Sequence, residues 1–159
     1  MQTPQSKQTN LYETDFYAWS QQQADLLRHQ QWHQLDLSNL IEEIESLERK
    51  ERQELRNRLS ILIAHLLKWE YQPTKRSRSW LSTIRIQRLD TAEIVAENPS
   101  LQSYLLEIVD KAYIKAIALA AGETNLPMKT FPQNCPYSLE NILSDRFYPG
   151  EPSSDDLMS

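Results

Sequence analysis

Glycine is the residue whose scarcity most limits the folds open to this chain. Only Gly122 and Gly150 occur among 159 residues. Glycine supplies most of the positive-φ positions in hairpins, tight turns and bulges, so a sheet-rich chain would lack residues for its corners. Leucine, a strong helix former, outnumbers the strand-favouring valine by 22 to 2. The sequence therefore predicts an all-α fold, because long helices need few such corners.

Apolar residues that recur every three or four positions predict an antiparallel bundle of about four main helices. Capping residues and prolines set the expected bounds at about 15–29, 37–71, 78–97 and 99–122. The apolar stripe of the second helix begins with Leu37, Leu40, Ile41, Ile44 and Leu47. The run ERKERQE that follows has no apolar residue, and a continuous helix with this stretch in water is favoured over a break. Gly122 is expected to end the fourth helix.

A proline-rich segment, LPMKTFPQNCPY, follows the fourth helix. Its prolines favour an extended path, so we expect a strap whose Leu126, Met128 and Phe131 pack on the bundle. Ser138 is expected to cap a short helix that runs from Leu139 to about residue 145.

The composition indicates one globular domain over residues 11–149, with flexible polar tails at 1–10 and 150–159. The single cysteine, Cys135, excludes an intramolecular disulfide and fits a reducing compartment. The first ten residues lack the apolar stretch of a secretory signal, and no run approaches the roughly 18 apolar residues of a membrane span. We therefore expect a cytoplasmic protein with no membrane partner.

The histidines do not form a pattern with strong chemical meaning. No Glu-x-x-His pair occurs, so a carboxylate-bridged metal centre is not predicted. Asp25, His29 and His33 lie four residues apart, but they align only if the first helix continues past 29, and exposed surface positions are favoured. A buried, hydrogen-bonded His65 is favoured over an acid–base group supported by Glu43, which leaves this pair as a candidate polar core. The sequence predicts no catalytic residue, metal or other cofactor.

A basic run from Lys68 to Arg88 is the strongest unexplained feature of a chain whose formal net charge is −5. The overall charge argues against a general nucleic-acid coat, but aromatic residues interleave with the cations here, as in sites for single strands or anionic ligands. The candidate binding residues are Lys75, Arg76, Arg78, Trp80, Arg85 and Arg88. For the last two, pairing within the chain, for instance with Glu107 or Asp110, is favoured over a phosphate-binding role.

Several longer motifs add a family resemblance. They are YETDFYAWSQQQADLLR, DLSNLIEEIESL, HLLKWEYQP, SRSWLSTIRIQR, NPSLQSYL, AAGETNLP and CPYSLENIL. In this order, over residues 12–149, they resemble the family called domain of unknown function 29. The resemblance implies an all-helical bundle from a mainly cyanobacterial family without an established activity, so it names a fold and not a function. Gln30 and Gln31 stand where the family pattern would place a glycine-bearing turn.

Three functions follow from these observations. The favoured one is a non-enzymatic regulatory or protein-interaction module with an unknown protein partner, because the chain lacks a complete catalytic set. The second is anion, phosphate or nucleic-acid binding through the basic hairpin, for which strong salt dependence would be diagnostic. The third is an enzyme that uses His65 as its acid or base. Whether the chain forms homo-oligomers is left open.

Overall fold

The computed structural model describes residues 11–159, and every regular element in this part of the chain is helical, which confirms the all-α prediction. The helices are α2 (Phe16–Arg28), α3 (Leu37–Tyr71), α4 (Arg78–Glu97), α5 (Gln102–Thr124), α6 (Leu139–Leu143) and α7 (Asp155–Met158). Single 3-10 turns are η1 (Trp32–Gln34), η2 (Pro73–Lys75), η3 (Pro99–Leu101) and η4 (Met128–Thr130). This part of the chain divides into two compact units, 11–50 and 51–159, with the division inside α3.

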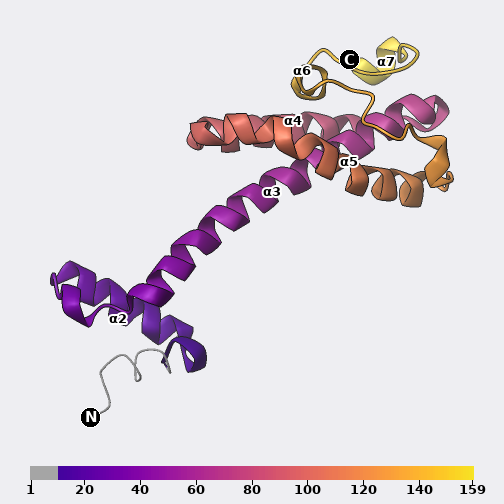
Figure 1. Cartoon of the computed structure of the whole chain (residues 1–159). Helices are drawn as coiled ribbons and strands as arrows, with labels where there is room; N and C mark the ends of the chain where they lie inside the picture. The colour runs from indigo at the N-terminus through magenta and orange to yellow at the C-terminus, as the bar shows by residue number, and fades with distance from the viewer. Residues whose placement is uncertain (1–10) are drawn as a thin grey trace. The chain divides into compact units, whose positions relative to one another are not determined.

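The first unit is a helical hairpin made by α2 and the beginning of α3 (Figure 1). The sequence allows either Thr14 or Asp15 as the cap of α2, and Asp15 takes this role, since its side chain accepts a hydrogen bond from the Ala18 amide at 3.0 Å. The helix ends at Arg28 with His29 as its C-cap, and Gln30 then takes a left-handed conformation with φ 56°. Gln30 therefore supplies the turn for which the family pattern suggested a glycine.

The second unit is a helical bundle, as predicted, whose core combines residues of α3, α4 and α5 (Figure 1). On α3 the core residues follow the predicted stripe, and Leu55, Leu59 and Leu62 are completely buried. α3 is one continuous helix, and its charged stretch 48–54 is exposed along its whole length. Ser77 caps α4 by accepting from the Trp80 amide at 3.2 Å, and α4 has the predicted bounds.

The end of the fourth helix differs from the prediction. α5 continues past Gly122 to Thr124, and Asn125 ends it with φ 60°. A Cβ added at Gly122 would meet nothing within 4 Å, so this glycine serves as an ordinary helical position. Asparagine tolerates the left-handed region better than most other residues, and it replaces glycine at this helix end.

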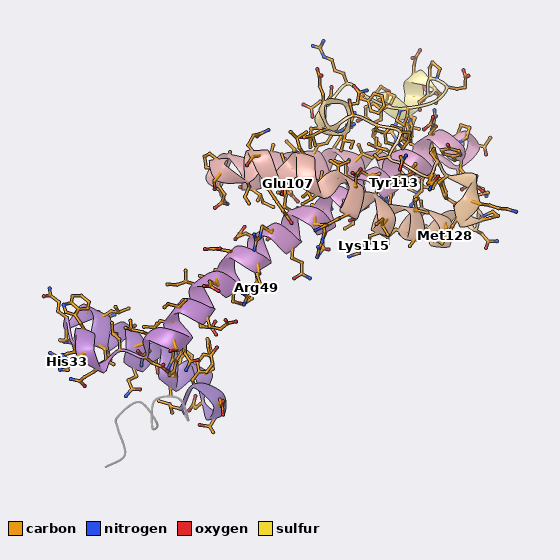
Figure 2. The ribbon with its side chains drawn as sticks, in the orientation of Figure 1. His33, Arg49, Glu107, Tyr113, Lys115 and Met128 are labelled. Atoms are coloured by element: carbon orange, nitrogen blue, oxygen red, sulfur yellow. The ribbon has the colours of Figure 1, made fainter. Side chains whose placement is uncertain are left out.

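Two of the three strap residues that were predicted to pack on the bundle do so. Phe131 is buried and its ring meets that of Tyr71 with centroids 5.1 Å apart, while Leu126 is partly buried against the core. Met128 was predicted to pack but is 56% exposed on the turn after α5 (Figure 2). Met128 begins the 3-10 turn η4, so the chain here does not follow the extended path that the prolines predict.

The two segments after the strap both contact the bundle. Ser138 caps α6 by accepting from the Asn141 amide at 3.1 Å, and the helix ends at Leu143, slightly earlier than expected. Residues 150–159, expected to be a flexible tail, contain α7, and Leu157 and Met158 pack against the core.

Candidate functional site

The candidate residues of the basic run separate by burial. Exposed positions are Lys75, Arg78 and Arg85, half-buried positions are Arg76 and Trp80, and Arg88 is buried. The run therefore does not present one uniform cationic surface.

Arg88 holds the segment around α6 in place. It is 3% exposed; its Nε donates to the Ile142 carbonyl at 2.9 Å and its Nη2 donates to the Phe147 carbonyl at 2.7 Å. Burial lowers the pKa of this guanidinium, and the nearby Tyr148 side chain partly offsets that effect. The partners are backbone carbonyls rather than the carboxylates that the sequence suggested, and they give Arg88 a structural role.

Arg76 is occupied by the C-terminal tail. Its guanidinium lies 4.9 Å from the centre of the Trp69 ring, and Nη1 donates to the Glu151 carbonyl at 2.6 Å and to the Ser153 hydroxyl at 3.1 Å. Burial lowers the Arg76 pKa, and the Glu151 carboxylate partly offsets this. An anion could take these donors only if the tail moved away.

Arg78 and Arg85 remain exposed beside the same tail. Nη2 of Arg78 donates to the Asp156 carbonyl at 2.8 Å. Together with Leu157 and Ser159, these two arginines line a surface pocket of about 170 Å³. Accessible positive charge of the predicted basic site therefore remains at this pocket and at the exposed Lys75.

His65 and Glu43 each have their own partner, and they belong to different units. The Nδ1 of His65 lies 2.9 Å from the Ile61 carbonyl oxygen, and burial lowers the pKa of the imidazole. Glu43 accepts a hydrogen bond of 2.5 Å from the Tyr12 hydroxyl. His65 and Glu43 therefore have different hydrogen-bond partners, and neither is the partner of the other.

The spacing of Asp25, His29 and His33 does not assemble a ligand set. α2 ends before His29, whose Nδ1 lies 2.8 Å from the Asp25 carbonyl, and Asp25 pairs with Arg28. His33 is exposed in the turn between α2 and α3 (Figure 2). Across residues 11–159, no group of three or more His, Cys, Asp or Glu is placed to hold a metal ion.

Hydrogen bonds between polar groups join the two arms of the hairpin. Trp19 is 2% exposed, and its Nε1 donates to Asp36 Oδ2 at 3.0 Å. The buried Gln23 accepts from the Asp36 amide at 2.8 Å, and Tyr12 bonds Glu43. These pairs match 12 with 43 and 19 with 36, so the two helices run antiparallel. Tyr12 lies just before α2 and Asp36 lies just before α3, so polar groups at the helix ends hold the hairpin together.

Many large apolar side chains of this hairpin are exposed. Of thirteen large apolar residues that are exposed in the described part of the chain, eight lie between 16 and 47. We call six of them the apolar hairpin face: Phe16, Leu27, Leu37, Ile41, Ile44 and Leu47, each between 43% and 61% exposed. The sequence stripe on α3 was correctly recognised, but no signal in its spacing shows that it lies in solvent.

Helical geometry places these six residues on one side of the hairpin. With about 100° of rotation per residue, Phe16 and Leu27 lie about 20° apart at one edge of the buried side of α2. On α3, the other four span about 120° beside the polar contact. Both groups are displaced from the contact in the same rotational sense, and in antiparallel helices this brings them to a common side.

The fold and its surfaces define an all-α helical-bundle protein that carries an exposed apolar hairpin. Residues 11–148 match the family model described as Domain of unknown function DUF29. The chain belongs to this family, which confirms the resemblance of its motifs. Comparisons with curated proteins and with solved structures gave no match. No helix in residues 11–159 has the length and apolar character needed to cross a bilayer.

Proposed function

We propose that this protein is a non-enzymatic interaction module that binds a protein partner through the apolar hairpin face. The observation that carries the proposal is the concentration of exposed apolar residues on this short hairpin. Single exposed apolar side chains are common on protein surfaces, but contiguous patches mark sites of association.

The size of the face suits a reversible interaction. Full burial of a leucine, isoleucine or phenylalanine stabilises by about 1.5–3 kcal/mol, so six half-exposed side chains offer about 6 kcal/mol in total. Association costs at least about 4 kcal/mol in lost freedom of motion. The surplus of at most about 2 kcal/mol corresponds by itself to a weak affinity, so polar contacts around the face must contribute to binding.

The test compares partner capture by three forms of the immobilised protein. The hairpin variant carries Ile41→Asp and Ile44→Asp. The control carries Leu106→Asp and Ile114→Asp, at apolar positions of the second unit that are somewhat more exposed. We expect a set of proteins from native extract that binds the wild type and the control but not the hairpin variant. Capture of the same set by all three forms would refute the proposal.

Anion binding at Arg78 and Arg85 is a second candidate, supported by the exposure of these two neighbouring guanidinium groups. Because the tail occupies Arg76 and contacts Arg78, removal of residues 150–159 should increase affinity for short polyphosphate at low ionic strength. Fluorescence anisotropy of labelled polyphosphate measures this. Equal, salt-insensitive binding before and after truncation would remove the candidate.

We also propose that the protein acts in the cytoplasm. The support is chemical: Cys135 is a half-buried thiol whose pKa is raised by burial, so it is a poor thiolate nucleophile and fits a reducing compartment. Localisation of a fluorescent fusion tests this proposal.

A further inference from the structure

The distribution of charge along the chain indicates which kind of protein partner the apolar hairpin face would bind. This inference rests on the interaction function proposed above. Residues 11–50 contain eight acidic side chains and three lysines or arginines, a formal net charge of −5. Residues 51–159 contain fourteen acidic side chains and thirteen lysines or arginines, a formal net charge of −1. The excess negative charge of the chain is therefore concentrated on the unit that carries the apolar hairpin face.

Acidic side chains border the apolar hairpin face along α3. Glu45 lies one helical turn after Ile41, and Glu48 lies one turn after Ile44. Both carboxylates are exposed. A partner that covers the isoleucines therefore brings its own flanking residues beside these two acids.

The length of the face indicates what shape of partner fits. From Leu37 to Leu47 the stripe extends about 15 Å along α3, which is nearly three helical turns. An amphipathic helix presents apolar residues at this spacing and is a common occupant of apolar helical surfaces. We infer that the apolar hairpin face binds a basic amphipathic helix, with apolar side chains on one side and flanking lysine or arginine residues that meet Glu45 and Glu48.

Other occupants fit the charge less well. A second copy would bring another hairpin of charge −5 against the first, and like charges across an interface oppose association. An anionic lipid surface would repel the hairpin for the same reason. The segment 1–10 carries one lysine and lacks an apolar repeat, so it does not match the required pattern.

The test uses two synthetic helical peptides with the same leucine pattern, one with lysine and one with glutamate at the polar positions. Isothermal titration calorimetry with the whole protein should show that the lysine peptide binds at least about tenfold more tightly, and that added salt reduces the preference. Glu45→Lys with Glu48→Lys should reduce or invert the preference. Ile41→Asp with Ile44→Asp should abolish binding, and circular dichroism checks that each variant is folded.

Two results would overturn the inference. The first is equal affinity for the two peptides. The second is binding of the lysine peptide that is unchanged in the aspartate variant, which would show attraction to negative charge elsewhere. If either occurs while partner capture still depends on Ile41 and Ile44, only the partner chemistry is wrong and the interaction function stands. Concentration-dependent dimers that the aspartate variant loses would instead identify a second copy as the occupant.

Discussion

Replacement of Arg88 tests how the bundle and its C-terminal segment are joined. Arg88 is 3% exposed and donates to the carbonyls of Ile142, Asn141 and Phe147 at 2.9, 3.3 and 2.7 Å. Its guanidinium also lies 5.1 Å from the centre of the Tyr148 ring. Arg88→Met keeps most of the side-chain volume but removes every donor, so three carbonyl groups lose their cationic partner.

The expected loss follows from these contacts. A hydrogen bond to a charged group contributes about 1.5–3 kcal/mol, and the two short bonds are the main ones, so the variant should lose about 3 kcal/mol of unfolding free energy. For a chain of this size the melting temperature should then fall by about 6–12 °C.

Urea denaturation followed by circular dichroism measures the difference. Arg85→Met is the matched control, because Arg85 lies one turn away but is exposed, and it should change stability by less than about 0.5 kcal/mol. If the two variants lose the same small amount, the structural role assigned to Arg88 is incorrect.

Two further stability predictions follow from burial. Phe131→Ala should cost about 3–5 kcal/mol in urea denaturation because its ring is buried, whereas Met128→Ala should stay within about 0.5 kcal/mol; equal effects would refute the packing described for the strap. Burial lowers the pKa of His65 in the folded state, so the unfolded state binds more protons and stability should fall as the pH drops below about 6.5. His65→Asn should reduce this loss in denaturation curves between about pH 7 and pH 5, and an unchanged pH dependence would contradict the assigned shift.

Local signals were sufficient to predict most helix bounds. The proline at 73 and the cap at Ser138 act on their immediate neighbours, so their effect can be derived from sequence. The end of α5 was missed because both Gly122 and Asn125 can end a helix, and only the structure shows that Asn125 takes the left-handed conformation.

Long-range partners could not be predicted in the same way. Arg88 bonds carbonyls more than fifty residues away, and backbone carbonyls leave no trace in the residue types of the partner segment. The apolar stripe at 37–47 showed which side of α3 is apolar but not what covers it. The hydrogen bond between Trp19 and Asp36, which joins the two helices of the hairpin, is likewise not encoded by spacing.

Site-specific photocrosslinking tests the docking role of the apolar hairpin face most directly. The photoreactive residue benzoylphenylalanine would replace Ile44 in one form of the protein and Ile114 in a control form; these side chains are 59% and 72% exposed. Irradiation in living cells should yield a covalent adduct with a discrete partner from position 44 and none from position 114. Adducts of the same kind from both positions, or from position 114 alone, would contradict the assignment of the apolar hairpin face as the docking surface.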